Sequence, residues 1–184
     1  MAKVANNIFI RGLSGSLGGQ FVVKQGRNGT IVSKYPVFDK NRKFTEAQVD
    51  RQSKFRDAVA YAKGAKGWAV YVEKAKASNR TPYHVAISDF CHAPEITKLD
   101  MSAWSGDAGQ VIRVQVVDDV QVTQVEVCIT DEAGSVLEQG MAIQAEGGWW
   151  MYTTTASAEG EVRVVVSARD LPGNIVEMSA PLRR

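Results

Sequence analysis

The sequence is poor in the residues that build disulfide frameworks and metal centres. Only two of its 184 residues are cysteines, Cys91 and Cys128, and only two are histidines, His84 and His92. Two widely separated thiols are too few for a disulfide framework and are typical of a protein that folds in a reducing compartment. The H-x6-C-H arrangement, with one remote cysteine, matches no recurrent zinc spacing. We therefore expect no disulfide, no zinc site and no cofactor.

Long hydrophobic runs are also missing. No stretch approaches the roughly 18 consecutive apolar residues of a membrane-spanning helix. The N-terminal residues MAKVANNIFIRG have no apolar run of signal-peptide length behind basic residues and no small-residue cleavage site. We expect a protein that stays in the cytoplasm after synthesis and has no membrane partner, unless a dedicated machine exports it or lysis releases it.

Catalytic and nucleotide-binding patterns are absent as well. Residues 11–20, RGLSGSLGGQ, contain four glycines, but they lack the Gly-Lys-Ser/Thr of a Walker loop and precede a strand-like QFVVKQ instead of a helix. The serines do not match the G-x-S-x-G nucleophile spacing. No acid-base pair or nucleophile with a base is recognisable elsewhere, so we expect a non-enzyme. The glycines are better explained by tight turns, close strand approach or a flexible reach to a neighbouring subunit.

The charge, in contrast, is strongly divided along the chain. Residues 1–80 hold 16 Lys and Arg against 5 Asp and Glu, a net charge of +11. Residues 81–184 hold 6 against 15, a net charge of −9. Each part therefore needs an oppositely charged partner, or the two parts are partners of each other.

The N-terminal part predicts a small sheet followed by helices. Short β-branched and aromatic runs predict strands over residues 7–11, 20–25 and 30–35, and Asn28-Gly29 between the last two predicts a hairpin. Pro36 ends the third strand. Thr45 as N-cap, with Gln48 three residues later, predicts a first helix whose buried stripe is Val49, Gln52, Phe55, Val59 and Ala62.

Two further helices complete this part. The spacing of Trp68, Tyr71, Val72 and Ala75 predicts a second helix over about residues 68–77. Thr81 as cap and Pro82 at the first helical position predict a third helix, which Pro94 ends. Its expected apolar face is Tyr83, Ala86, Ile87 and Phe90.

The C-terminal part predicts a different architecture. Seven candidate strands follow one another over residues 95–99, 110–117, 122–130, 135–145, 149–155, 161–168 and 174–180, the number expected of an immunoglobulin-like sandwich. Alternation directs one set of side chains inward: Ile112, Val114, Val116, Val125, Val127, Ile129, Trp150, Tyr152, Val162, Val164, Val166 and Ala168. We predict an α+β protein with a β-hairpin and helical module over residues 1–93 and a sandwich over residues 94–184.

The C-terminal segments VQVVDDVQVTQVEVCITDEAGSVLEQG, GWWMYTTT and VRVVVSARDLPGN resemble bacterial immunoglobulin-like domains, which serve as structural modules in surface, phage and appendage proteins. The resemblance covers about residues 95–180 and is most specific at A-x-D-x-x-G-N, from Ala168 to Asn174. It implies a binding or spacer module without an active site. The sequence departs from the antibody pattern because it lacks the bridging cysteine pair, and alternation places Cys128 away from the core. The first 65 residues, with GLSGSLGGQFVVKQ and FTEAQVDRQSKFRDAVAYAK, are similar to the N-terminal segment of uncharacterised Bacteroidetes proteins, some in phage-like neighbourhoods.

One candidate ion site arises from the loops of the sandwich. In an immunoglobulin-like topology the loops with Asp118 and Asp119, and with Asp170 and Asn174, share one end of the domain, where oxygen ligands would suit calcium. The alternative is that Asp and Asn are here as ordinary turn residues.

These observations favour a structural protein that assembles head to tail, its N-terminal strands adding to the sheet edge of a neighbouring copy. One alternative is an adaptor whose basic module binds nucleic acid. Another is a carbohydrate or protein adhesin whose ligand stacks on the ring of Trp104 or Trp149. Under the first two hypotheses the contact residues are Arg11, Lys24, Arg27, Lys34, Lys40, Arg42, Lys43, Arg51 and Lys54.

Overall fold

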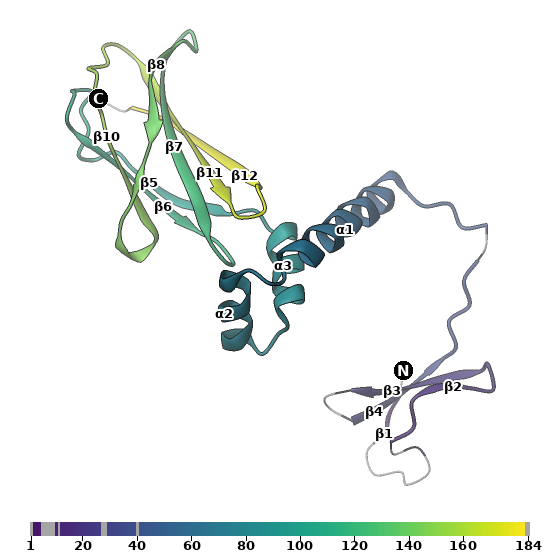
Figure 1. Cartoon of the computed structure of the whole chain (residues 1–184). Coiled ribbons are helices and arrows are strands. Elements are labelled where there is room, and N and C mark those ends of the chain that lie inside the picture. Colours follow the sequence, from purple (N-terminus) through teal and green to yellow (C-terminus); the bar gives the residue numbers. More distant parts are fainter. Residues whose placement is uncertain (1, 5–9, 11, 27–28, 40, 183–184) are drawn as a thin grey trace. The chain divides into compact units, whose positions relative to one another are not determined.

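The computed structural model describes residues 2–4, 10, 12–26, 29–39 and 41–182. The chain divides into two compact units, Met1–Thr45 and Glu46–Arg184. Three helices follow the small N-terminal sheet and precede an all-β region, so the α+β class is confirmed (Figure 1). The predicted division at residues 93 and 94 marks the change from helices to strands, which lies inside the second unit.

The first unit is an antiparallel four-stranded sheet with the order β1-β4-β3-β2. Its strands are β1 (Ala2–Val4), β2 (Gly15–Leu17), β3 (Phe21–Gly26) and β4 (Gly29–Lys34). The predicted hairpin is confirmed, because β3 and β4 pair with Gly26 opposite Gly29. The strand predicted over residues 7–11 falls outside the described residues except for residue 10, which lies in a turn.

The glycine-rich stretch forms a strand and a tight turn. β2 pairs with β3, and Gly18 and Gly19 between them have φ angles of 58° and 65°. The N–H of Gln20 donates to the carbonyl of Leu17 at 3.1 Å. Two consecutive residues with positive φ are what a type I′ turn requires, so a side chain at either position would be strained. The turn is as expected, whereas the strand was not predicted, because Gly-Ser-Leu has no β-branched residue.

The helices begin and end where the capping residues indicate. They are α1 (Glu46–Ala65), α2 (Ala69–Ser78) and α3 (Pro82–Cys91). The Thr81 hydroxyl accepts a hydrogen bond from the N–H of His84 at 3.3 Å, which confirms the predicted N-cap. Asn79 ends α2 in the left-handed conformation, with a φ of 51°. The helices share one small core of Ala62, Ala65, Tyr71, Ala75, Val85 and Ala86.

The predicted buried stripe of α1 is wrong over its first half. Val49 is 47% exposed and Phe55 is 55% exposed, and burial begins only at Ala58. The reason is the length of the helices. α1 has 20 residues, whereas α2 and α3 have 10 each, so these helices do not cover the whole length of α1. On α3 the fully buried residues are Val85, Ala86 and Asp89, so Ala86 alone of the predicted apolar face is fully buried.

The sandwich consists of two antiparallel sheets with the orders β5-β6-β10-β9 and β12-β11-β7-β8. With β5, β6, β10 and β9 as strands A, B, E and D, and the others as G, F, C and C′, this is an immunoglobulin-type arrangement. The bounds are β5 (Glu95–Asp100), β6 (Val111–Val117), β7 (Val122–Asp131), β8 (Val136–Met141), β9 (Ile143–Gln144), β10 (Trp149–Thr153), β11 (Val162–Asp170) and β12 (Ile175–Pro181).

The predicted core of the sandwich is confirmed in full. All twelve side chains that alternation directs inward are buried, because successive residues of a strand face opposite sides of its sheet. Cys128 is half-buried on the outer face, as predicted. The strand predicted over residues 135–145 is broken, however. The N–H of Ala142 donates to the carbonyl of Val125 at 2.9 Å, and the chain passes there from one sheet to the other.

Candidate functional site

The basic residues proposed for partner contact do not form one patch. Lys24 of β3 lies opposite Ile31, whereas Lys34 of β4 lies opposite Phe21. Residues paired across strands share a face and successive residues alternate, so these two lysines lie on opposite faces of the sheet. Arg42 and Lys43 follow in the segment before α1. Three candidates lie outside the described residues: Arg11, Arg27 and Lys40.

The two remaining basic candidates, Arg51 and Lys54, lie on α1 and so belong to the second unit. The Lys54 ammonium donates to the carbonyl of Cys91 at 3.1 Å. This bond satisfies a carbonyl at the end of α3, where no further turn of helix provides a donor. Lys54 therefore has an internal structural role in addition to any contact with a partner.

One face of the N-terminal sheet carries the apolar residues Leu17, Phe21, Val23 and Val32, together with Gln25, Thr30 and Lys34. We call it the apolar face. Over residues 10, 12–26, 29–39 and 41–45, Val23 and Thr30 are the buried residues of this unit. Leu17 and Phe21 are 45% and 48% exposed. Beside this face a shallow hollow of about 500 Å³ is lined by Gly19, Gln20, Phe21, Lys34, Tyr35 and Val37. Val23 and Thr30 lie on this face, so it is exposed at the end that carries Leu17 and Phe21, and buried where Val23 and Thr30 lie.

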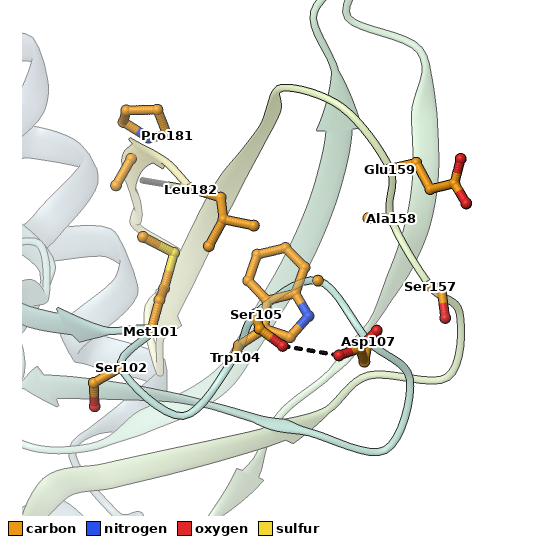
Figure 2. Close-up of a pocket in the computed structure, with 12 residues that line it drawn as sticks. Met101, Ser102, Trp104, Ser105, Asp107, Ser157, Ala158, Glu159, Pro181 and Leu182 are labelled. Atoms are coloured by element: carbon orange, nitrogen blue, oxygen red, sulfur yellow. Dashed lines mark hydrogen bonds between the residues drawn. The ribbon is translucent and has the colours of Figure 1, made fainter. Parts of the chain in front are cut away.

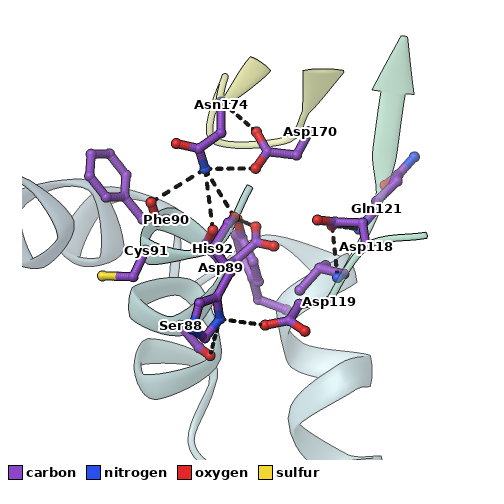
Figure 3. A network of polar contacts seen from close by, with 12 residues as sticks. Ser88, Asp89, Phe90, Cys91, His92, Asp118, Asp119, Gln121, Asp170 and Asn174 are labelled. Atoms are coloured by element: carbon purple, nitrogen blue, oxygen red, sulfur yellow. Dashed lines mark hydrogen bonds and ion pairs between the residues drawn. The ribbon is translucent and has the colours of Figure 1, made fainter. Parts of the chain in front are cut away.

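At one end of the sandwich a polar network joins α3 to two loops (Figure 3). Asp170 is buried and accepts hydrogen bonds from the N–H groups of Gly173 and Asn174 at 2.8 and 2.6 Å. The Asn174 side-chain amide lies 3.2 to 3.4 Å from the carbonyl oxygens of Asp89, Phe90 and His92. These carbonyls belong to the last turn of α3 and its C-cap, which lack partners within the helix. Asn174 therefore fastens the helix end to the β11–β12 turn.

The four calcium candidates lie near one another, but their carboxylate oxygens already bind N–H groups and side chains of the protein. Asp118 accepts from the N–H groups of Val120 and Gln121 at 2.9 and 2.8 Å. Asp119 pairs with the exposed His92 at 2.8 Å. Over the described ranges, residues 41–182 included, no group of three or more His, Cys, Asp or Glu is placed to hold a metal ion. The calcium hypothesis has no ligand set in this part of the chain.

A buried carboxylate that the sequence interpretation missed lies behind this network. Asp89 is 0% exposed and accepts a hydrogen bond from the Tyr71 hydroxyl at 2.5 Å, which lies 2.7 Å from the Tyr61 hydroxyl. Burial, together with repulsion from Asp118 and Asp170, raises the pKa of Asp89 to about 7. Burial likewise raises the pKa of Tyr71. The sequence did carry a signal, since Asp89 follows Val85 and Ala86 at helical spacing.

A hollow of about 1120 Å³ lies beside Trp104, between the segment after β5, the segment after β10 and the end of β12 (Figure 2). Ser105 donates to Asp107 at 2.9 Å, and no histidine or cysteine lines the hollow. Trp104 is 3% exposed, so it is a core residue and the proposed stacking platform at this position is wrong. Trp149 is half-buried, and the Arg113 guanidinium lies 5.0 Å from its ring centre.

Comparison with known proteins finds distant matches among solved structures. No family model and no curated protein sequence matches the chain. CopC from Methylosinus trichosporium OB3b is 18% identical, with 49% of this chain and 90% of that chain covered and a TM-score of 0.37. A tetra-tandem repeat from the extending region of a large adhesion protein is 23% identical, with 48% and 22% covered and a TM-score of 0.33. A conjugative transposon lipoprotein from Bacteroides eggerthii DSM 20697 is 12% identical, with 50% and 95% covered and a TM-score of 0.27. This chain spans 16% of a further match, an engineered protein. All are distant matches.

The role of Asn174 leads to a first prediction. Asn174→Ala is expected to lower the free energy of unfolding by about 1–2 kcal/mol, because carbonyls at the end of α3 and one Asp170 oxygen lose a donor. Urea denaturation followed by circular dichroism measures this change. Ser179→Ala, at an exposed position of β12, is the control and is expected to unfold at the wild-type urea concentration. Equal midpoints for the two variants would mean that Asn174 does not fasten the helix.

Proposed function

We propose that this protein is a non-enzymatic structural protein that self-assembles through its N-terminal strands and basic module and displays an immunoglobulin-like sandwich. The observation that carries the proposal is the apolar face of the N-terminal sheet. The described residues of this unit form a single four-stranded sheet without a second layer of helices or strands, and Phe21 and Leu17 remain about half exposed. A sheet with one apolar face needs a covering layer to be stable in water. Neighbouring copies provide that layer in an assembly.

The charge of the chain supports the same proposal. Residues 1–45 contain eight Lys and Arg and one Asp, a net charge of +7. Residues 81–184 have a net charge of −9. A contact between the first unit of one copy and the sandwich of the next is therefore attractive, and its two surfaces differ. Such a head-to-tail contact forms rings if it closes and filaments if it does not.

The biological setting belongs to the proposal as well. The similarity to bacterial immunoglobulin-like domains and to phage-associated Bacteroidetes segments supports a virion, tube or appendage as the assembly. In the described residues no helix has the length and apolar character needed to cross a bilayer. We propose synthesis in the cytoplasm and later inclusion in an assembly that is exported or released by lysis.

The proposal predicts that the purified protein forms particles without any other component. Purified full-length protein is expected to form large particles as its concentration rises at low ionic strength, and electron microscopy with sedimentation velocity measures them. Phe21→Ser is expected to reduce particle formation at least tenfold, because it removes the largest side chain of the apolar face. Val22→Ser changes the neighbouring residue on the opposite face and is expected to assemble like the wild type. A wild-type protein that stays monomeric at high concentration would refute self-assembly.

The second candidate function is a nucleic-acid-associated adaptor, favoured by the excess of positive charge in residues 1–80. Contacts with phosphates make affinity fall steeply with salt concentration, whatever the sequence of the duplex. A salt titration with two unrelated duplexes separates the candidates. Tight binding with a steep salt dependence supports the adaptor, and particle growth in the absence of nucleic acid supports assembly. The separation of Lys24 and Lys34 on opposite faces of the sheet favours assembly.

A further inference from the structure

The sandwich has four edge strands in residues 95–181, and three of them carry features that discourage a new strand. β5 has a bulge between Ile96 and Lys98, and the exposed Lys98 stands in the strand. β12 has the exposed Glu177 at its middle and ends at Pro181. β9 consists of two residues. Bulges, edge charges, prolines and very short strands are the usual devices by which proteins prevent sheets from joining at their edges.

The fourth edge strand, β8, lacks these devices over most of its length. Its bulge lies at the beginning, at Leu137, and residues 138–141 pair regularly with β7. It contains no proline and no lysine. Its single charged side chain, Glu138, is buried between the sheets, where it accepts from Tyr152 at 2.7 Å. The outward side chains include Met141, which is 55% exposed. β8 therefore presents an open, mostly uncharged edge.

The position of β8 is also firmly fixed. Besides the Tyr152 hydroxyl, Glu138 accepts hydrogen bonds from the N–H and hydroxyl of Thr155 at 2.6 and 2.8 Å. A Cβ added at Gly140 would lie 2.8 Å from the Tyr152 ring, so the backbone of β8 lies directly against that ring. A rigid strand loses little conformational freedom when another strand pairs with it.

We infer that the open edge of β8 receives β2 of a second copy of this chain, which joins the two sheets into one. This inference rests on the proposed self-assembly and adds an edge-to-edge contact to the covering of the apolar face. β2 is itself an edge strand, and Gly15-Ser16-Leu17 has neither charge nor proline. The main chain of such a strand supplies the hydrogen bonds of β-augmentation, which requires little of the side chains.

Charge and apolar surface on the two sides fit each other. The carboxylates of Glu126, Asp131 and Glu132 lie on β7 and in the turn that leads to β8. The unit that contains β2 has a net charge of +7. Leu17 of β2 and Met141 of β8 are about half exposed on their own units, and each gains an apolar neighbour when the strands pair. Two copies of β8 would instead bring like charges together. A second copy's β2 is therefore the better occupant.

Crosslinking tests the pairing directly. In full-length protein with Cys91→Ser and Cys128→Ser, one preparation carries Leu17→Cys and another carries Gln139→Cys or Met141→Cys, which lie on the same face of their strand. Oxidation of the mixture is expected to give a disulfide-linked dimer of one chain of each kind in at least one of the two combinations, because paired strands bring side chains within disulfide distance. A mixture of Leu17→Cys with Ser179→Cys, on the opposite edge of the same sheet, is expected to give none.

A charge at the edge provides a second, independent test. Met141→Lys is expected to reduce particle growth at least tenfold, whereas Ser179→Lys adds the same charge to β12 and leaves growth unchanged. Thermal unfolding shows whether each variant is folded. Wild-type particles with no crosslink to β8 and normal growth of Met141→Lys would overturn the inference and leave self-assembly intact. A dominant crosslink between two Gln139→Cys chains would overturn it too, while a wild type without particles would refute both proposals.

Discussion

Replacing Glu138 by alanine is expected to lower the free energy of unfolding by about 3–5 kcal/mol. Glu138 is 9% exposed, and its carboxylate accepts from the Tyr152 hydroxyl, the Thr155 N–H and hydroxyl, and the Ala156 N–H. These contacts tie β8 to β10 and to the segment after it, across the two sheets. In the alanine variant the buried donors lose their partner and water does not readily replace it. Guanidinium denaturation at pH 7 measures the loss.

The pH dependence of the same residue provides a check. Burial by itself would raise the pKa of Glu138, but the hydrogen bonds from Tyr152, Thr155 and Ala156 outweigh it and lower the pKa below 4.5. Its contribution to stability is therefore present above about pH 4.5 and is lost as the pH falls through the lowered pKa. Glu177→Ala, on exposed β12, is the matched control and is expected to change stability by less than about 0.5 kcal/mol. Equal loss of stability in both variants would mean that the hydrogen bonds of Glu138 do not contribute to the free energy of unfolding.

Asp89→Asn is expected to have the opposite effect, a gain in stability above pH 7. The pKa of Asp89 rises from 3.8 to about 7, chiefly through burial and then through Asp118, Asp170 and Asp119. The folded protein thus binds a proton that the unfolded chain releases near pH 4, and wild-type stability falls as the pH rises from about 4 to 7. The full shift corresponds to about 4 kcal/mol, and the amide N–H groups that asparagine brings into the buried site reduce the expected gain to about 2–3 kcal/mol. Asparagine still accepts from Tyr71 and carries no charge.

The measurement is the difference in free energy of unfolding between Asp89→Asn and wild type at several pH values. It is expected to be small at pH 4, to increase between pH 4 and 7, and to stay constant above pH 8. Asp57→Asn is the control, because Asp57 is exposed on α1 and is not among the carboxylates that raise the pKa of Asp89. A difference that does not change with pH would show that Asp89 is already ionised in the folded protein at pH 4.

The sandwich could be predicted nearly residue by residue. Alternation of Val114 and Val116, or of Val164 and Val166, has a period of two, and one buried face is enough to produce it. The cap of α3 was equally predictable, because Thr81 and Pro82 act within one turn of helix. These features depend on neighbours in the sequence, so the sequence contains the information that determines them.

The candidate surfaces could be predicted only in part. The apolar residues of α1 suggested a buried stripe, yet Val49 and Phe55 are exposed, because burial depends on whether another helix is long enough to reach them. The basic residues suggested one patch, but strand pairing places Lys24 and Lys34 on opposite faces. Asp89 interacts with residues far from it in the chain, which no local pattern relates to it: Asn174 donates to its carbonyl, and Asp170 raises the pKa of its side chain.

The sequence by itself determined the α+β class, the helix that begins after Thr81, the hairpin of β3 and β4, and the inward residues of the sandwich, since each follows from a local period or turn. Only the tertiary structure decided that the helices join the sandwich in one compact unit, that Glu138 ties the two sheets together and that β8 is left as an open edge. Such features depend on which distant segments come together, and the packing of the whole chain settles that.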